Sequence, residues 1–159
     1  MRRLAVIVAA AAVLTGCASE PLRPCTLVGT PVGVGLSVAA PLAAKVRSAT
    51  VEVCWDGSCR RPRLELYQGS RAGEQTCSGE ACSAVAVPTA EKHGFADVAG
   101  LPKRPVEVRL TLRGARGASL LDTTVRVTPK GRFPNGPECG EGGPNAMLTV
   151  DAGGNVRES

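Results

Sequence analysis

The chain has 159 residues, 19 of them lysine or arginine and 14 aspartate or glutamate, with a formal net charge of +5. This small basic excess, with scattered arginines and only four aromatic residues, argues against nucleic-acid binding, which favours clustered cations and aromatic stacking platforms. The length suits one domain with its own hydrophobic core.

The first residues have the pattern of an export signal. Arg2 and Arg3 precede an uncharged apolar run at residues 4–14. A helix needs about 20 apolar residues to span a bilayer, so this run is too short for a membrane span. We expect residues 1–16 to be removed, which takes away two arginines and lowers the net charge to +3. Such a charge suits a protein beside an anionic membrane surface.

The apolar run closes on Leu14-Thr15-Gly16-Cys17. These residues resemble the lipobox of bacterial lipoproteins, in which a diacylglyceryl lipid is attached to the cysteine before the chain is cut in front of it. The resemblance implies a palmitate-type lipid on Cys17, no other cofactor, and a protein anchored on the outer face of the cell membrane. Two acyl chains anchor stably where one holds weakly. The alternative is an ordinary secreted protein whose signal contains a cysteine.

The composition adds a second resemblance. The alanine, glycine, arginine and valine bias, together with the lipobox, is similar to that of actinobacterial lipoproteins with an immunoglobulin-like domain. After Cys17, residues 18–24 form a tether of mixed polarity with two prolines. Seven residues span at most about 25 Å, so the domain is expected to sit close to the bilayer.

Six further cysteines point to a disulfide framework, because an even number in an exported chain indicates paired sulfurs. Six cysteines allow 15 pairings. The spacing favours Cys54–Cys59, Cys77–Cys82 and Cys25–Cys139.

The first of these pairs follows from a predicted hairpin. Residues 50–55 alternate between apolar and polar side chains, and Asp56-Gly57 is a strong two-residue turn. A two-residue loop places Cys54 opposite Cys59, with Cα atoms about 4.5 Å apart, which a disulfide can bridge. The second pair has the same C-x4-C spacing around a turn, and the last two cysteines then remain for each other.

Alternation and turn residues predict the remaining elements. The expected strands cover residues 28–38, 49–55, 64–67, 82–87, 95–98, 106–113, 121–128 and 145–151. The first is expected to be an edge strand interrupted at Pro31, with glycines where another backbone approaches. Residues 41–46 are expected to form one helical turn, and residues 68–80 and 129–144 to form loops.

The clearest hairpin joins residues 106–113 to residues 121–128, because one face of each strand is apolar and the other polar. Short strands with turns between them predict an all-β fold, an antiparallel immunoglobulin-like β-sandwich of seven or eight strands. A small open β-barrel is the alternative. We expect the domain to cover residues 25–151, followed by a frayed polar tail at residues 152–159.

Catalytic patterns are weak. His93 is the sole histidine, and the segment 35–39 lacks the second glycine of a nucleophile elbow. The C-x4-C spacings fit neither the C-x2-C of zinc sites nor the C-x-x-C of redox motifs, so no metal is expected.

The candidate binding residues lie instead on the first hairpin. They are Trp55, Asp56, Arg60 and Arg61, with Glu52 expected opposite Arg61. We therefore expect a non-enzymatic binding or structural module with an envelope protein or polymer as partner. An extracytoplasmic enzyme or a thiol-redox protein with an unrecognised site is the alternative.

Overall fold

A computed structural model describes residues 24–159 of the chain. The expected export signal, the lipobox and Cys17 lie outside these residues, as does most of the expected tether. Within the described residues the chain forms ten strands and one short helix. The elements are β1 (Gly33–Val38), α1 (Leu42–Lys45), β2 (Ser48–Trp55), β3 (Ser58–Arg60), β4 (Tyr67–Ser78), β5 (Ala81–Asp97), β6 (Val106–Arg113), β7 (Ser119–Val127), β8 (Lys130–Arg132), β9 (Gly142–Val150) and β10 (Val156–Glu158).

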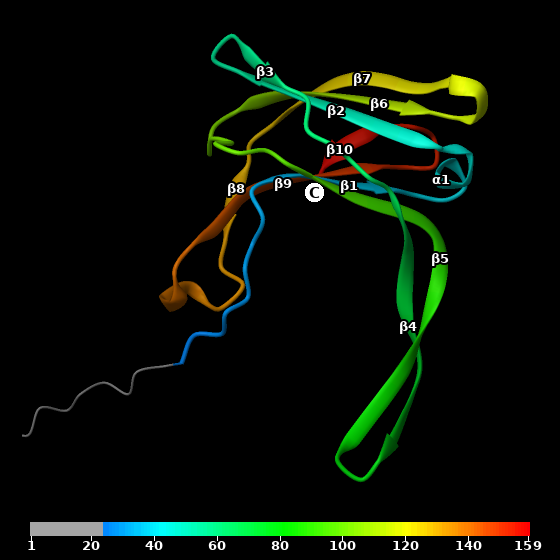
Figure 1. Ribbon diagram of the computed structural model, residues 1–159, viewed down its shortest axis with the longest axis vertical. Helices are drawn as coiled ribbons and strands as arrows, with labels where there is room; N and C mark the ends of the chain where they lie inside the picture. The colour runs from blue at the N-terminus through cyan, green and yellow to red at the C-terminus, as the bar shows by residue number, and fades with distance from the viewer. Residues whose placement is uncertain (1–23) are drawn as a thin grey trace, which may run out of the picture.

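Two sheets pack face to face (Figure 1). One has the strand order β3-β2-β6-β7, and the other has the order β10-β9-β1-β5-β4, with β8 also paired to β9. The all-β sandwich is therefore confirmed. The pairs are antiparallel except that β1 and β9 run parallel, so the expectation of a purely antiparallel sandwich was too narrow.

The core lies between the sheets, and alternate residues of β1, β2, β6 and β9 make up most of it. In β6, Val106, Val108, Leu110 and Leu112 are all buried, and the residues between them face outward. The predicted hairpin is confirmed, since Val106 pairs with Val127 across β6 and β7. Burying a valine or leucine side chain contributes about 1.5–3 kcal/mol, so this interface is a main source of stability.

The expected edge strand is a central one. Strand β1 begins only after Pro31 and lies between β5 and β9. Its glycines permit this packing: a Cβ on Gly33 would lie 2.0 Å from the backbone oxygen of Ala96, and one on Gly35 would lie 2.2 Å from Sδ of Met147. The predicted close approach of neighbouring groups at the glycines is confirmed. The predicted edge position is wrong, because the strand has a neighbouring strand on each side.

The expected loop at residues 68–80 is wrong, because this segment is most of β4. The three short strands expected at 64–67, 82–87 and 95–98 are also corrected, since β4 begins at Tyr67 and one long strand, β5, covers the other two. Strands β4 and β5 form a long hairpin that projects from the sandwich (Figure 1). Nearly all its side chains are exposed, so no apolar alternation marked it in the sequence.

The C-terminal part of the chain is more ordered than expected. Residues 129–144 include β8, a 3-10 turn at Pro137–Cys139 and the start of β9. The tail forms β10 on β9, because Oδ1 of Asp151 accepts backbone N–H bonds of 2.9 Å from Gly153 and Asn155 and so closes the intervening turn. These hydrogen bonds, with that from the Asn155 side chain as the largest cause, lower the pKa of Asp151.

The expected helical turn and the expected disulfides are confirmed. The helical turn is α1, and all three disulfides are those that the spacing favoured: Cys25–Cys139, Cys54–Cys59 and Cys77–Cys82. Three disulfides indicate an oxidising, extracytoplasmic environment.

Candidate functional site

The hairpin of β2 and β3 has the geometry that the sequence predicted. Asp56 and Gly57 form the turn with φ values of 49° and 73°, a left-handed conformation that this residue pair tolerates. Cys54 lies opposite Cys59 with a Cα–Cα distance of 4.1 Å. The disulfide therefore fixes the register of a hairpin whose short strand β3 is exposed.

Trp55 and Arg60 form the first half of the candidate binding set. The indole is partly buried and packs against the core, and the guanidinium carbon of Arg60 lies 5.2 Å from its ring centroid. This cation–π contact covers one ring face. The core and Arg60 together leave little of the indole to stack on a ligand, so Trp55 mainly anchors the hairpin.

Asp56 and Arg61 form the second half, and each is held by an ion pair. Arg104, from the connection before β6, pairs with Asp56, and Arg61 pairs with Glu52 of β2. The expected neighbourhood of Glu52 and Arg61 is thus confirmed. The four candidate residues do not converge on one point: the structure divides them among the core side, the tip and the outer face of the hairpin.

The outer face of the β3-β2-β6-β7 sheet holds two shallow hollows. One, of about 380 Å³, is lined by Thr50, Val51, Glu52, Arg61, Pro62, Arg109 and Thr111. The other, of about 410 Å³, is lined by Cys54, Trp55, Asp56, Gly57, Cys59, Arg104, Pro105, Glu107 and Arg126. Both hollows mix cations with anions, so this face suits a polar or zwitterionic surface better than a purely anionic ligand.

Arg109 connects these charges across the sheet. Its Nε and a terminal nitrogen donate hydrogen bonds of 2.9 and 2.8 Å to the two carboxylate oxygens of Asp122. This bidentate pair lowers the pKa of Asp122, with the hydrogen bond from Arg109 as the largest cause, and raises the pKa of Arg109. A carboxylate held in its ionised form is poorly suited to act as a general acid near neutral pH.

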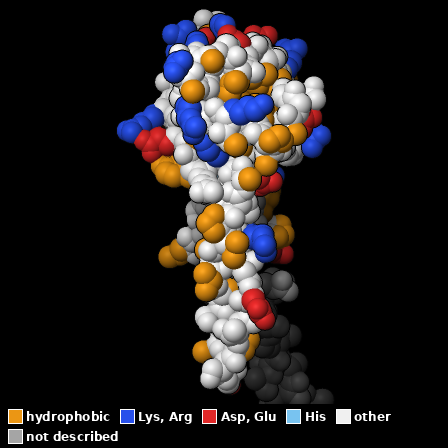
Figure 2. Space-filling view, turned by 90° about the vertical axis from the view of Figure 1, so that its right-hand side faces the viewer, with side chains coloured by type: hydrophobic (Ala, Val, Ile, Leu, Met, Phe, Trp, Pro, Cys, Tyr) orange, Lys and Arg blue, Asp and Glu red, His pale blue; other side chains and the backbone are white. Residues whose placement is uncertain are grey.

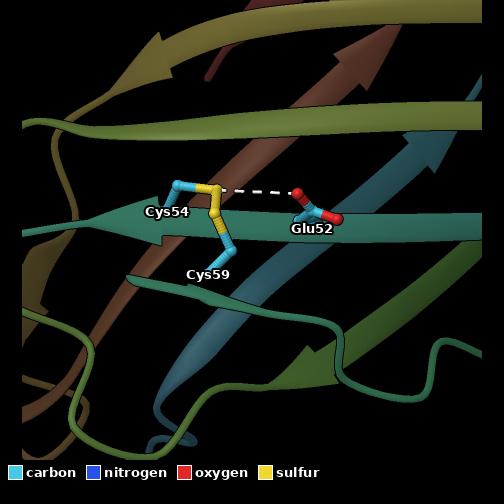
Figure 3. Close-up of side chains that lie close together, drawn as sticks. All are labelled: Glu52, Cys54 and Cys59. Atoms are coloured by element: carbon cyan, nitrogen blue, oxygen red, sulfur yellow. Dashed lines mark hydrogen bonds between the residues drawn. A yellow bond between two sulfur atoms is a disulfide. The ribbon is translucent and has the colours of Figure 1, made fainter. Parts of the chain in front are cut away.

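Glu52, Cys54 and Cys59 lie close together on the outer face of the hairpin (Figure 3). The spacing alone resembles a set of metal ligands. The two sulfurs are bonded to each other, however, and metals bind thiolates. The 3.7 Å separation between Sγ of Cys54 and a Glu52 oxygen is a contact beside a disulfide, because that sulfur carries no proton.

His93 lies on β5, and its side chain is half exposed. Its Nε2 lies 3.6 Å from a carboxylate oxygen of Glu91, and the strand register places Ser37 opposite it. Among the described residues, no hydrogen bond joins the hydroxyl of Ser37 to the imidazole. Ser37 and His93 therefore do not form a catalytic pair in which the imidazole acts as a base for the hydroxyl nucleophile.

Sequence reasoning missed the charged residues that other segments of the chain bring to this hairpin and its sheet. Arg104, Arg109 and Asp122 complete the charged outer face, yet none was singled out. A signal for two of them was available, since Arg109 and Asp122 occupy the polar positions of the predicted hairpin and so had to share its outer face. Arg104 lies in a connector, where alternation gives no such information.

No family model, curated protein or solved structure matches this chain. In the described part of the chain, none of the helical segments has both the length and the apolar character of a membrane span.

Proposed function

We propose that this chain is a lipid-anchored protein of the cell envelope and that its β-sandwich is a non-enzymatic binding or structural module. The observation that carries the proposal is the cysteine pairing. All six cysteines of residues 24–159 pair with one another, so none of them serves as a partner for Cys17. A separate role for Cys17 in lipid attachment, after the Leu14-Thr15-Gly16 sequence, is in keeping with this.

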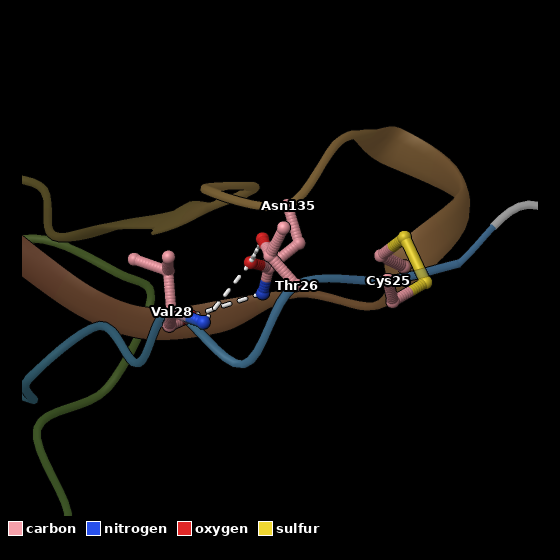
Figure 4. The surroundings of a disulfide bond; sticks show 5 residues. Cys25, Thr26, Val28 and Asn135 are labelled. Carbon is pink, nitrogen blue, oxygen red and sulfur yellow. Dashed lines mark hydrogen bonds between the residues drawn. A yellow bond between two sulfur atoms is a disulfide. The ribbon is translucent and has the colours of Figure 1, made fainter. Parts of the chain in front are cut away.

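The segment that follows the expected tether supports the proposal. Cys25 is bonded to Cys139, and the side-chain amide of Asn135 holds the backbone of Val28 at both its N–H and its C=O (Figure 4), at 3.1 and 3.0 Å. Thr26 donates a hydroxyl hydrogen bond to the same amide oxygen. A lipid on Cys17 would therefore connect to the fixed part of the domain through residues 18–24 alone, which holds the sandwich near the bilayer.

The binding role rests on the outer face of the β3-β2-β6-β7 sheet. This face combines two hollows, three cross-strand or hairpin ion pairs and a disulfide-fixed tip. A rigid surface of alternating charges recognises a partner with a complementary pattern. Such a partner is an envelope protein or polymer.

The anchoring is tested by feeding cells a palmitate analogue that carries an alkyne and comparing the full chain with the Cys17→Ala variant. We expect the full chain to be labelled, to begin at Cys17 by mass spectrometry, and to sediment with membranes. The variant should be unlabelled. The double variant Cys25→Ser/Cys139→Ser is the matched control and should still be labelled. An unlabelled, unprocessed full chain in the soluble fraction would refute the proposal.

One observation favours a second candidate, a thiol-redox protein. The Cys54–Cys59 disulfide lies at an exposed hairpin, with Cys59 exposed and a pocket beside it. Exposed disulfides are more accessible to attacking thiolates. A titration with reducing dithiols in which Cys54–Cys59 alone opens at a potential near that of cellular thiol pools would favour this candidate over the binding module.

A further inference from the structure

The hairpin of β4 and β5 extends well beyond the sandwich. We call residues 70–88 the arm. The register pairs Ser70 with Pro88 at its base and Ser78 with Ala81 at its end, where the Cys77–Cys82 disulfide crosslinks the tip. Figures 1 and 2 show the arm as a narrow projection from the body. Its side chains are almost all exposed, and Val85 is 76% exposed.

A two-stranded ribbon of this kind is only marginally stable in water, since stable sheets need a third strand or a packed face. The arm has neither, so it is held together only by the pairing of its two strands and by its disulfide. The arm therefore has the features of a surface that another molecule covers.

One face of the arm is uncharged and rich in small apolar groups. The register places on this face Ala72, Cys77, Cys82, Ala84, Ala86 and Pro88. Ser70 and Gln75 lie on the same face, and neither carries a charge, whereas Glu74 lies in a bulge between Ala72 and Gln75. The opposite face carries Val85, Val87 and the cation Arg71. Figure 2 shows the contrast with the body, where charged side chains are more numerous.

The chemistry of the arm excludes several classes of partner. Only three of its 19 residues are charged, and Arg71 is its one cation, which does not suit an anionic polymer or lipid headgroups. Insertion into a bilayer would leave both strand edges without hydrogen bonds. The arm has no aromatic residue on which a sugar or base could stack. A protein surface with small, uncharged side chains remains.

We propose that the uncharged face of the arm packs against the same face of the arm of a second copy of this chain, around a two-fold axis that runs along the arm. Identical uncharged faces meet without charge repulsion, and two-fold homodimers are the commonest oligomers. The direction of the axis follows from the position of the N-terminal segment. Residues 24–31 leave the sandwich on the side from which the arm projects (Figure 1), so this axis keeps both N-terminal segments on one side.

The contact between the two arms is small, so the proposed dimer depends on both copies being held on the membrane. In this respect the proposal rests on the proposed lipid anchor. Nine residues at about 3.3 Å each give an arm about 30 Å long, and two strands give a width of about 10 Å. Each face therefore covers about 300 Å², and the pair buries about 600 Å², half of what the smallest stable interfaces bury. Two copies held on one membrane meet at a much higher effective concentration, which a contact of this size requires.

The test places a photo-crosslinking amino acid at Ala84 in the full chain, in cells, with the same substitution at Val85 as the matched control. The two residues are neighbours in β5, and their side chains lie on opposite faces of the arm. We expect a crosslinked homodimer from Ala84 and little from Val85. Membrane fractionation of the same cells reports the anchoring separately.

A second pair of variants tests whether the crosslink reports a specific contact. In these variants the photo-crosslinking amino acid is placed at Ala86, and the yield of crosslinked dimer is measured. Ala84→Glu should lower the dimer yield about tenfold or more, because it brings like charges together, whereas Val85→Glu should leave it unchanged. Crosslinks from Ala84 to another protein, equal yields from both positions, or no crosslink in anchored protein would overturn the arm dimer while leaving the lipid anchor in place. A chain that is not anchored would overturn the proposed function.

Discussion

The long-range disulfide Cys25–Cys139 should contribute more to stability than either hairpin disulfide, although its half-cystines lie in surface segments. The chain-entropy treatment makes this contribution depend on the length of the loop that the crosslink closes. A sequence separation of 114 corresponds to about 5 kcal/mol, and a separation of 5 corresponds to about 2 kcal/mol. The difference, about 3 kcal/mol, is well above the error of an unfolding experiment.

The perturbation is the double variant Cys25→Ser/Cys139→Ser, compared with Cys54→Ser/Cys59→Ser, both in a chain that also carries Cys17→Ser and lacks the lipid. Urea denaturation followed by circular dichroism gives the free energy of unfolding and its denaturant slope, m. We expect the first variant to lose about 5 kcal/mol and to have a larger m, because its unfolded chain expands and exposes more surface. The second should lose about 2 kcal/mol with little change in m.

Contacts near the long-range disulfide need a separate control, because Asn135 hydrogen bonds also fasten the N-terminal segment. Asn135→Ala removes them while keeping the crosslink, and we expect it to cost about 1–2 kcal/mol with m unchanged. Equal losses in the two cysteine variants, or an unchanged m in the first, would show that the crosslink does not act through the unfolded chain.

Three further predictions test the core and the charged face. Gly33→Ala should cost about 3 kcal/mol or more, because its new Cβ meets rigid backbone, whereas Gly35→Ala should cost about 1 kcal/mol, because a flexible side chain can move aside; urea denaturation of both variants measures the difference. Leu148→Ala, at a fully buried position, should cost about 2–5 kcal/mol in the same assay. The lowered pKa of Asp122 means that its pairing with Arg109 stabilises the fold above the unfolded-state pKa of about 3.9 and is lost as the pH falls through the lower folded-state value. Asp122→Asn should therefore be less stable than the native chain at pH 6, by a difference that shrinks as the pH is lowered below about 3.9, and a difference that stays constant on acidification would contradict the assignment.

The elements that the sequence predicted best are those with one buried face. The hairpin of β6 and β7 was predicted with its buried and exposed faces because Val106 to Leu112 alternate with polar residues, and alternation reports half-burial directly. The arm was predicted only in part, as a strand at residues 82–87, and the strand over residues 68–80 was missed for the complementary reason. Neither of its faces is buried, so its polar and small residues followed the pattern of a loop.

Long-range pairing also lay beyond local patterns. Glycines and Pro31 suggested an edge position for β1, but its place between β5 and β9 depends on a partner more than 100 residues away. In the candidate site, too, the local features could be predicted from the sequence and the long-range contacts could not. The turn at Asp56 fixed the local hairpin and its disulfide, whereas the ion pair that Arg104 makes with Asp56 depends on how the connector before β6 crosses the sheet.

The crosslink between Cys25 and Cys139 has a mechanical consequence. Tension applied at the N-terminal end passes through the two sulfurs directly to residue 139, so the chain between the two cysteines lies in a closed loop that the tension cannot lengthen. Within the domain that begins at Cys25, a pull between the two termini can lengthen only the part of the chain after residue 139, which contains β9 and β10. Such a pull would separate β9 from β1 and remove β9 and β10 from their sheet. The chain between Cys25 and Cys139, which includes the whole of the other sheet, would keep its length. A domain that is crosslinked in this way resists a pull at its N-terminal attachment with covalent bonds. Only its last 20 residues can unfold and lengthen under that pull.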